Sequence, residues 1–568
     1  MTDYSVASPV PKEVQLALKD YPEFLQQLLF NRGVTDQETA QLFLEPSYDE
    51  HLHDPFLLPD MEVAVSRILQ AIEKKEHIAV FGDYDSDGIP GTVVLHDFLQ
   101  AVGHTNFSIH IPHRHYDGFG LSVKAVSKIV AKHSPAILIT IDCGTSDLEA
   151  AEAAKQAGID LIITDHHEPK EVLPTATAIV NPKCGDSYPF SELCGAAVIY
   201  KVVQAVLAQG DFAIPPGKEK WWLDMVGIAT VADMVPLVGE NRVLAYYGLQ
   251  VLRKSRRPGL QQLLRKQRAS QPHLTEDDIG FTIGPRINAA SRMDTPEDAF
   301  GLLASTDEGE AGAFVEHLEL LNTQRKTSVG QMTKELHKRV EVVTELPGVL
   351  VFGNPEWRPS LVGLAANKLA EEYNRPAFLW GRDGNENCKG SCRSNGVVSV
   401  VRLMEAAPQV FQNYGGHHMS GGFTIAPAYL HTFGEMLVQA HEELGTAAAI
   451  PTEVSVDAVL QLDDIDKELL QLQRQCAPFG CANPKPIYLF KNITPTEVVL
   501  FGKAKEHSKI MFKSSGLVQE AIAFFKTPEQ FTQVPKAGQP INILAHLEES
   551  YFMGRLQTRL RVVDVVVA

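Results

Sequence analysis

The sequence lacks the features of a membrane protein and of a disulfide-stabilised protein. No apolar run approaches the roughly 18 residues that are needed to span a bilayer. The chain starts with Met1-Thr2-Asp3-Tyr4-Ser5 and shows no basic segment followed by an apolar one. Its seven cysteines are odd in number and scattered, which suits a reducing compartment better than a disulfide framework. We therefore expect a cytoplasmic protein without a membrane segment.

A zinc site is not favoured either. Cys388 and Cys392 form one loose pair and Cys476 and Cys481 another, but neither pair has C-x-x-C spacing and no histidine pair accompanies them. These four cysteines are better explained as small core residues.

An excess of positive charge is also missing. The net charge of −19 argues against a protein that coats nucleic acid non-specifically. One segment differs, because residues 253–268 carry seven positive charges and no negative one. A solvated helix flank and a face that follows a phosphate backbone explain this segment equally well.

The pattern of residues 60–165 is the clearest structural signal in the chain, whose 568 residues suffice for roughly three to four domains. Apolar runs typical of strands alternate with amphipathic stretches typical of helices. We predict helices at 63–74, 91–102, 122–132 and 147–157, and strands at 77–81, 108–111, 136–141 and 160–164. This alternation indicates βαβ units and a parallel sheet.

Acidic residues and histidines follow the predicted strands. Asp83, Asp85 and Asp87 come after the first strand, Asp142 after the third, and His166 with His167 after the fourth. In open α/β sheets, ligands bind at the carboxyl ends of the strands. Taken alone, the first loop also fits a solvated turn with a helix cap. However, aspartates at every second position repel one another and need cations nearby.

Asp233 extends this set, because it ends an apolar helix predicted at 221–232, although a helix cap is the simpler explanation for it alone. Carboxylates with one or two imidazoles suit Mn²⁺, with Mg²⁺ as the alternative, better than thiolate-preferring metals. An aspartate between two cations can bridge them, and two cations can hold both oxygens of a phosphoryl displacement. The sequence therefore favours a two-metal phosphoesterase.

Two motifs resemble the DHH phosphoesterase superfamily: Asp83-Tyr84-Asp85-Ser86-Asp87-Gly88 and Asp165-His166-His167. Further stretches narrow the resemblance to the RecJ family of bacterial exonucleases. They are Pro112–Leu121, Ile283–Ala290, Leu321–Arg325, Gly390–Ser394, Gly415–His418 and, toward the end, Ala477–Gly480 with Asn483–Pro486. The resemblance covers nearly all of the chain beyond about residue 50.

The resemblance implies an α/β fold in several parts. A helical lead-in at 1–55 would precede a parallel-sheet DHH domain at 56–310. A long connecting helix at 311–345, readable over 311–343, would lead to a DHH-associated α/β domain at 346–446. After a linker at 445–451, an OB-type β-barrel for nucleic acid would occupy 453–568, where Val/Ile alternation fits barrel strands.

The resemblance also implies an activity: two-metal-dependent 5′→3′ hydrolysis of single-stranded DNA to 5′-mononucleotides, in DNA repair and recombination. A monomer is expected, with a helicase and a single-strand-binding protein as partners. Asp85 would bind one of two Mn²⁺ ions, with Asp142 as the bridge and Asp83 orienting a ligand or water. The other ion would be held by Asp87, His166 and Asp233. His167 would protonate the leaving oxygen or stabilise the transition state.

The resemblance further implies that a 5′-terminal phosphate would lie between the two α/β domains. Arginine suits this task because its planar fork meets two phosphate oxygens at once, and a glycine pair lets backbone N–H groups approach. The candidates for substrate binding are Arg114, Arg286, Arg292, Ser391, Arg393, Gly415, Gly416 and His417.

Two other functions fit part of the pattern. A DHH-type oligonucleotide or cyclic-dinucleotide phosphodiesterase would use the same metal site, but such enzymes typically lack the OB domain, which suits extended strands. A metal-free binding scaffold is disfavoured because every ligand candidate is present. The chain departs from the family pattern at Trp357-Arg358-Pro359-Ser360, which lacks the usual histidine and glycine and puts one contact of the second domain in doubt.

Overall fold

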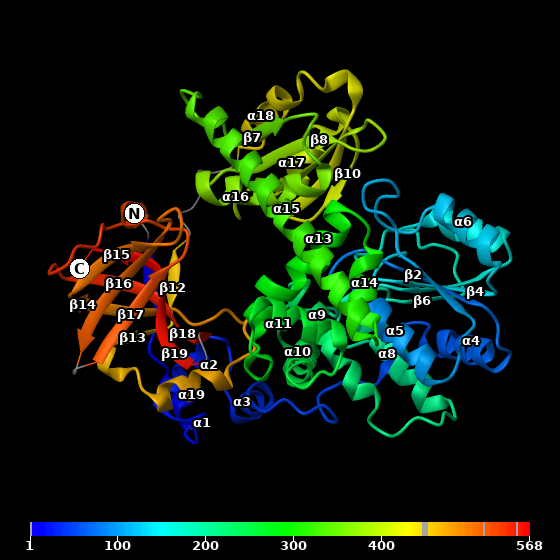
Figure 1. Cartoon of the computed structure of the whole chain (residues 1–568), viewed down its shortest axis with the longest axis horizontal. Helices are drawn as coiled ribbons and strands as arrows, with labels where there is room; N and C mark the ends of the chain where they lie inside the picture. Colours follow the sequence, from blue (N-terminus) through cyan, green and yellow to red (C-terminus); the bar gives the residue numbers. More distant parts are fainter. Residues whose placement is uncertain (1–2, 446–452, 515–516, 553–554, 568) are drawn as a thin grey trace.

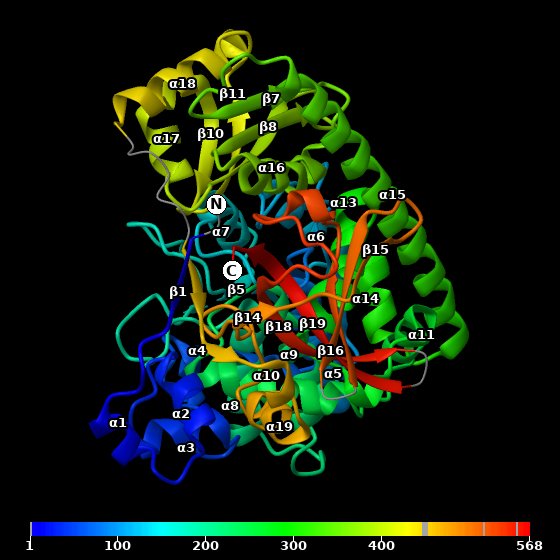
Figure 2. The ribbon, with the colours of Figure 1, turned by 90° about the vertical axis from the view of Figure 1, so that its left-hand side faces the viewer.

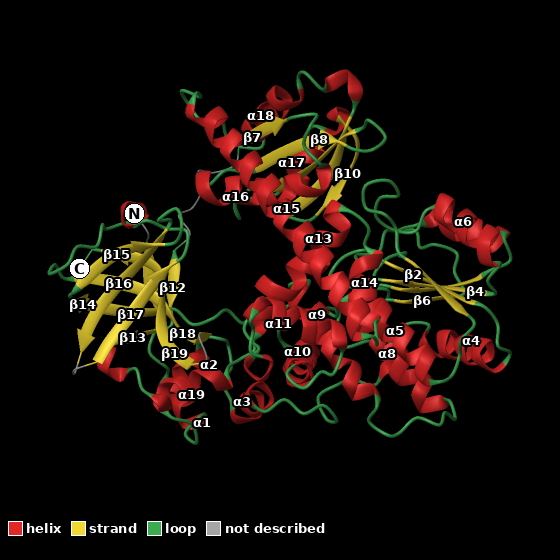
Figure 3. Cartoon of the chain, viewed as in Figure 1, coloured by secondary structure: helices red, strands yellow, loops and turns green. Residues whose placement is uncertain are grey.

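The computed structural model describes residues 3–445, 453–514, 517–552 and 555–567. Three groups of strands lie at three corners of the molecule, with helices between them (Figures 1 and 3). Both ends of the chain lie beside the strands of the C-terminal group (Figure 1). The linker predicted at 445–451 falls outside the described residues from position 446 onward.

A five-stranded parallel sheet in the order β3-β2-β4-β5-β6 forms the first group. Its strands are β2 (Ile78–Gly82), β3 (Phe107–His110), β4 (Ile137–Ile141), β5 (Asp160–Thr164) and β6 (Ala178–Val180). Its helices are α4 (Met61–Glu73), α5 (Gly88–Ala101), α6 (Val123–His133), α7 (Leu148–Gln156) and α8 (Gly195–Gln209). The predicted alternation of helix and strand is confirmed, with small differences at the element ends.

Helices cover both faces of this sheet because successive strand residues point to opposite sides. Val80 and Ile139 pack with the core that contains α4, α5 and α8. Their neighbours Phe81 and Leu138 pack with α6 and α7 on the other face. The carboxyl ends of the strands are left for the acidic loops. Helix α5 begins at Gly88, with Pro90 in its first turn, where proline is tolerated.

A helical segment follows the sheet. It contains a 3₁₀ turn (Glu219–Trp222) and a π-helical turn (Ile279–Ile283), together with α9 (Leu223–Ala232), α10 (Gly239–Leu252), α11 (Pro258–Gln267), α12 (Glu276–Asp278), α13 (Gly284–Met293), α14 (Glu297–Ala304) and α15 (Glu308–Glu341). Helix α15 is the predicted connecting helix, and it runs from beside α11 to the second α/β domain (Figure 2).

The second domain has a mixed five-stranded sheet in the order β10-β11-β9-β8-β7, in which only β7 and β8 pair in parallel. Its strands are β7 (Leu350–Gly353), β8 (Ala377–Arg382), β9 (Cys388–Arg393), β10 (Phe411–Gly416) and β11 (Ser420–Ile425). Helix α16 (Pro359–Tyr373) packs on one face together with α15. Helices α17 (Val400–Ala406) and α18 (Phe433–Glu443) cover the other face.

The C-terminal domain is a seven-stranded sheet in the order β13-β14-β18-β19-β17-β16-β15. Its strands are β13 (Ala458–Leu460), β14 (Tyr488–Ile493), β15 (Glu497–Phe501), β16 (His507–Ser514), β17 (Leu517–Ala523), β18 (Ile541–Phe552) and β19 (Arg555–Val566), with helix α19 (Lys467–Gln475). The predicted barrel strands are therefore present.

The first residues of the chain belong to this same domain. Strand β1 (Tyr4–Val6) pairs in parallel with β12 (Val454–Val456). Helices α1 (Lys12–Ala17), α2 (Glu23–Phe30) and α3 (Gln37–Leu44) share one apolar core with β14, β16 and β18. Arg242 from α10 connects the lead-in to the C-terminal domain, because its guanidinium donates to the carbonyl oxygens of Phe43 (2.6 Å) and Ala477 (3.0 Å). The lead-in is thus a structural part of the C-terminal domain.

The basic segment at 253–268 is not a continuous charged face. Arg257 lies between Asp97 (2.7 Å) and Asp224 (2.9 Å), and Arg253 donates to the carbonyl oxygen of Leu274. Lys266 forms an ion pair with Glu316. Several of the seven charges thus stabilise the fold.

Two expectations that were based on composition can be compared with the structure. All seven cysteines are free, but Cys481 is exposed and is not the core residue that was predicted. Among the described helices, none combines the length and the apolar character needed to cross a membrane.

Candidate metal centre and phosphate site

The predicted ligands converge at the carboxyl edge of the parallel sheet. The loops after β2, β4 and β5 bring Asp87, Asp142 and His166 together, and Asp233 arrives as the residue that caps α9. The Nε2 atom of His166 lies 3.2 Å from Oδ1 of Asp142. It lies 3.6 Å from Oδ2 of Asp87 and 3.7 Å from Oδ2 of Asp233.

Backbone N–H groups orient the first acidic loop. The carboxylate of Asp87 accepts hydrogen bonds from the N–H groups of Gly195 (2.6 Å) and Ala196 (2.7 Å), at the start of α8, where the helix dipole favours a negative charge. Gly195 has to be glycine, because an added Cβ would lie 2.5 Å from Cβ of Asp142. Oδ1 of Asp85 accepts from the N–H of Asp87 (2.8 Å). Helix α8 thereby sets the position of the loop.

Two carboxylates in this centre are buried without a hydrogen-bond donor to one of their oxygens. Oδ1 of Asp83 and Oδ1 of Asp142 have no such partner among the described residues. Burial is the main cause that raises the pKa of both carboxyl groups well above the ordinary value. The negative charge of Asp85 adds to this effect on Asp83, and that of Asp87 adds to it on Asp142. Burying unpartnered carboxylate oxygens is costly unless a cation neutralises them. Asp142 also has a backbone φ of +63°, a strained conformation that functional sites retain.

The donor atoms fall into three groups whose members lie within 4.8 Å of one another. These groups are Asp83 with Asp85 and Asp142, Asp87 with His166 and Asp233, and Asp142 with His166 and His167. Oxygen and imidazole donors of this kind fit Mn²⁺ and Mg²⁺. The residues present therefore fit divalent cations.

The electrostatics of the centre follow from burial and crowding. Burial, followed by Asp85, raises the pKa of Asp87 to about 7. Burial, followed by Asp87, raises the pKa of Asp233 to about 9. Burial, helped by His167, lowers the pKa of His166 to about 4, which leaves its imidazole neutral and able to bind a cation.

His167 has the opposite character. Burial alone would lower its pKa, but the hydrogen bond and charge of Asp165 raise the pKa to about 9. Nδ1 of His167 lies 2.8 Å from Oδ1 of Asp165, and Asp165 accepts a further bond from the N–H of Thr145. A charged imidazolium therefore lies beside the candidate ligands.

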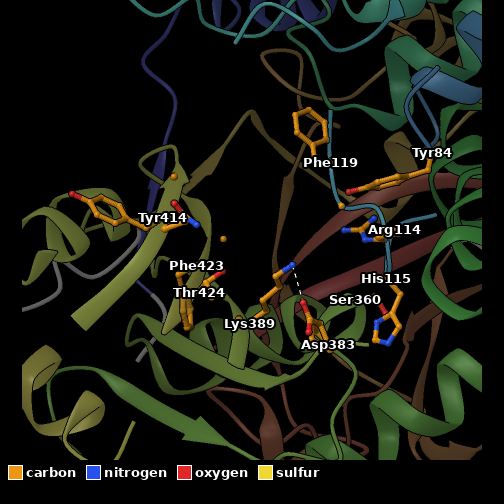
Figure 4. Close-up of a pocket in the computed structure, with 16 residues that line it drawn as sticks. Tyr84, Arg114, His115, Phe119, Ser360, Asp383, Lys389, Tyr414, Phe423 and Thr424 are labelled. Carbon is orange, nitrogen blue, oxygen red and sulfur yellow. Dashed lines mark ion pairs between the residues drawn. The ribbon is translucent and has the colours of Figure 1, made fainter. Parts of the chain in front are cut away.

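A pocket of about 560 Å³ lies between the DHH domain and the second domain. Tyr84, Arg114 and Phe119 line one side, and Tyr414 and Lys389 line the other (Figure 4). The guanidinium of Arg114 lies 4.8 Å from the centre of the Tyr84 ring. The pocket joins the two α/β domains close to the metal ligands.

Several arginines gather beside this pocket. Burial, followed by the charges of Arg114 and Arg325 and, more weakly, of Arg393, lowers the pKa of Arg292 to about 9. Ser391 and Arg393 lie on β9, and Gly415 on β10 lines the pocket, with Gly416 next to it. His417 is exposed in the turn after β10. Crowded guanidinium groups indicate a site for an anion.

Arg286 does not join this set. Its side chain is buried and paired with Glu319 (2.9 Å) and Gln267 (2.6 Å), and its remaining N–H groups donate to the carbonyl oxygens of Phe281 and Thr282. Because every N–H of the guanidinium is engaged, none is free for a phosphate. Arg286 is therefore engaged within the fold and does not line the pocket between the two α/β domains.

Known proteins match this arrangement. Three family models match the chain: the DHH family, N-terminal domain, over residues 77–230, the DHHA1 domain over 345–443, and the RecJ OB domain over 456–564. The single-stranded-DNA-specific exonuclease RecJ of Bacillus subtilis (strain 168) is 33% identical over 544 residues, which are 95% of this chain and 67% of that protein. The protein of the same name from Escherichia coli (strain K12) is 32% identical over 489 residues, 83% of either chain.

The chain belongs to the RecJ family. A solved structure agrees with this assignment. The crystal structure of RecJ in complex with Mn²⁺ from Thermus thermophilus matches with a TM-score of 0.82 and 25% identity, over 100% of this chain and 80% of that one. The predicted order of DHH domain, connecting helix, DHH-associated domain and OB domain is confirmed.

Several residues of this RecJ site could not be assigned from the sequence. Asp165 was visible as part of a motif, but its role in holding His167 depends on a hydrogen bond. Asn288 from α13 donates to Oγ of Ser86 (2.9 Å), which ties the acidic loop to a helix 202 positions later in the chain. Lys389 lines the pocket with its Nζ 2.9 Å from Asp383. In the sequence, Asp165 and Asn288 could have been found through the motifs that contain them.

The segment that departs from the RecJ pattern joins the two α/β domains. Nη1 of Arg292 donates to the carbonyl oxygen of Ser360 (2.6 Å), and Oγ of Ser360 donates to the carbonyl oxygen of Arg292 (2.8 Å). Arg358 donates to the carbonyl oxygen of Met293. Ser360 and Arg358 thus hold α16 against α13 at the edge of the pocket.

Proposed function

We propose that the chain is a two-metal-dependent exonuclease that hydrolyses single-stranded DNA from its 5′ end and releases 5′-mononucleotides. The observation that carries the proposal is the convergence of Asp83, Asp85, Asp87, Asp142, His166 and Asp233 at one sheet edge, in a chain of the RecJ family. The roles in DNA repair and recombination, with a helicase and a single-strand-binding protein as partners, form the finer part of the proposal and rest on the resemblance.

The ligand assignment uses the groups of donor atoms. Asp85 would hold one cation, with Asp83 close enough to assist. Asp87, His166 and Asp233 would hold the other, and Asp142 would bridge, since it stands within reach of both groups. The chemistry that two Mn²⁺ or Mg²⁺ ions supply when bound is Lewis-acid activation of water and neutralisation of charge on the phosphate.

The residues around the scissile phosphate would act as follows. A water molecule loses a proton to bulk solvent as its oxygen bonds to the phosphorus, and the bond from phosphorus to the 3′-oxygen of the terminal nucleotide breaks. His167, with Nδ1 fixed by Asp165, gives a proton from Nε2 to that leaving oxygen. The water oxygen then remains on the new 5′-phosphate of the shortened strand.

A 5′-terminal phosphate would set the position of the strand. Arg114, Arg292 and Arg393 supply the positive charge and Ser391 a hydroxyl, with Gly415, Gly416 and His417 on the side of the second domain. Charge-assisted bonds from arginine to phosphate are strong and directional. Holding the terminal phosphate would place the next phosphodiester at the metal centre.

The test uses the full chain with Mn²⁺ and single-stranded DNA that is labelled at the 5′ or the 3′ end. Asp142→Ala serves as the inactive control. The proposal expects immediate release of a labelled mononucleotide from the 5′ end only, and no release by the control.

Other outcomes would reject the proposal in different ways. Cleavage confined to oligonucleotides of two to five residues would indicate the oligonucleotide phosphodiesterase activity instead. Binding of single strands without any turnover in Mn²⁺ would indicate a scaffold.

A further inference from the structure

We infer that Phe525, together with His507 and Phe524, forms a stacking site on the C-terminal domain for unpaired bases of a single strand. This inference rests on the proposed function, because it names a second place where the substrate strand is held. The site is separate from the metal centre and from the pocket between the two α/β domains.

Phe525 is the most exposed phenylalanine among the described residues, with 78% of its surface accessible. It follows strand β17 and has a backbone φ of +55°, which is unfavourable for a bulky side chain. Such strain persists where the surrounding structure enforces it, and it occurs preferentially at functional positions. Because most of its surface is exposed, this ring contributes little to the core of the domain.

The neighbouring residues hold Phe525 in this strained conformation. The N–H of Phe525 donates to Nδ1 of His507 (2.9 Å). The next residue, Lys526, accepts from Oγ of Ser508 at its carbonyl oxygen and donates from Nζ to the carbonyl oxygen of Val563. The ring is therefore presented to solvent by fixed contacts on both sides.

Other rings extend the surface behind Phe525. His507 packs edge-on against Phe525, with ring centres 4.7 Å apart, and against Phe524 at 5.5 Å. Phe501 packs against His507 at 5.0 Å, and the guanidinium of Arg559 lies over Phe524. Aromatic surfaces of this kind stack on nucleobases of any sequence.

The charges nearby favour a polyanion. Residues 502–506 connect Phe501 to His507 and carry Lys503 and Lys505, both exposed and without an ion pair among the described residues. The one acid of this loop, Glu506, is bonded to the N–H of Ala504 and lies 3.5 Å from His507. Exposed rings beside uncommitted lysines fit a strand with free bases better than a duplex, whose bases are already stacked.

The first experiment compares two substitutions at the same position in the full chain. Phe525→Leu removes the ring but keeps an apolar side chain, whereas Phe525→Tyr keeps the ring. Binding is measured by fluorescence anisotropy in EDTA, so that no strand is cleaved. The probes are an oligothymidylate long enough to reach from the metal centre to the C-terminal domain and an abasic backbone of the same length.

Phe525→Leu is expected to weaken binding of the oligothymidylate about fivefold or more, while Phe525→Tyr binds within about twofold of the unchanged protein. Binding of the abasic strand should not distinguish the two variants. In Mn²⁺, KM for the long strand should rise with Phe525→Leu while kcat and dinucleotide cleavage stay the same. Equal binding of oligothymidylate by both variants, or equal losses on both probes, would overturn the inference.

A second measurement needs no substitution and covers a variant that fails to fold. A single strand carrying 5-iodouracil is irradiated with the unchanged protein, and the crosslinked tryptic peptide is identified. Crosslinking to the peptide of residues 514–526 would support the stacking site, and crosslinks confined to other peptides would reject it. Because binding and crosslinking do not need turnover, they fail independently of the exonuclease assay.

Discussion

The buried ion pair between Lys201 and Glu240 fixes the helix that positions Asp87. Both side chains are fully buried, and Nζ of Lys201 lies 2.6 Å from Oε1 of Glu240. Lys201 also donates to the carbonyl oxygen of His53, and Glu240 accepts from the N–H of His53 and the hydroxyl of Tyr188. The pair therefore connects α8, α10 and the segment before α4.

Lys201→Met would leave the charge of Glu240 buried without its cation. Breaking a buried pair in this way costs about 3–5 kcal/mol, which is a large part of the roughly 5–15 kcal/mol that stabilises a typical domain. Because about 1.4 kcal/mol corresponds to a factor of ten, hydrogen exchange of the α8 amides is expected to become at least about a hundredfold faster. The double variant Lys201→Met/Glu240→Gln is expected to recover much of this loss, because no unpaired charge remains.

Mass spectrometry of exchanged peptides from α8 measures the effect directly, with peptides of the C-terminal domain as the internal reference. An increase of less than tenfold in the single variant would refute the reasoning. So would a double variant that exchanges as fast as the single one.

Three further predictions concern metal, pH and the terminal phosphate. EDTA is expected to abolish cleavage but not strand binding. Mn²⁺ at a hundred times its Kd should raise the free energy of unfolding by about 2.7 kcal/mol for each site that it occupies, an increase that Asp142→Ala loses in thermal scans. Burial, opposed by Lys485, raises the pKa of Glu276 from 4.5 to about 7, so the folded state holds this proton more tightly and stability falls as the pH rises from 4.5 to 7. Glu276→Gln should therefore be more stable than the unchanged protein by up to about 3 kcal/mol at pH 8 and by less than about 1 kcal/mol at pH 5, and equal differences in urea titrations at both pH values would contradict this. Arg114→Gln is expected to raise KM about tenfold or more for 5′-phosphorylated strands only. Arg286→Gln should instead lower thermal stability and leave the preference for a 5′-phosphate intact. The reverse result would exchange the roles of these two arginines.

Local patterns in the sequence were enough to predict the catalytic sheet. Strands β2, β4 and β5 are short runs rich in apolar residues, each followed directly by an aspartate, and helices α6 and α7 between the strands have an amphipathic pattern. The position of Asp142 directly after β4 follows from this pattern alone, because parallel strands end at the same edge. Helix α15, by contrast, was expected from the family resemblance, and its 34 residues exceed the length of an ordinary helix.

The rest depended on contacts between distant parts of the chain. Arg286 looked like a phosphate ligand because its motif resembles one, yet its partner Glu319 lies on another helix and leaves no mark near it in the sequence. The lead-in likewise has no local signal for its packing against β14 and β16. The lack of a hydrogen-bond donor to Oδ1 of Asp142 among the described residues can be recognised only when every possible donor has been placed.

The shared core of the lead-in and the C-terminal domain has a consequence for synthesis at the ribosome. Asn31 donates to Asp457, 426 positions later. At about 5–20 residues per second, translation needs roughly 20 to 85 seconds to bridge that interval. Throughout this time Leu25, Leu28 and Leu29 lack the strands that will bury them. The nascent chain therefore carries the unburied apolar face of α2 while its parallel-sheet domain folds, and this segment is where a holding chaperone would act.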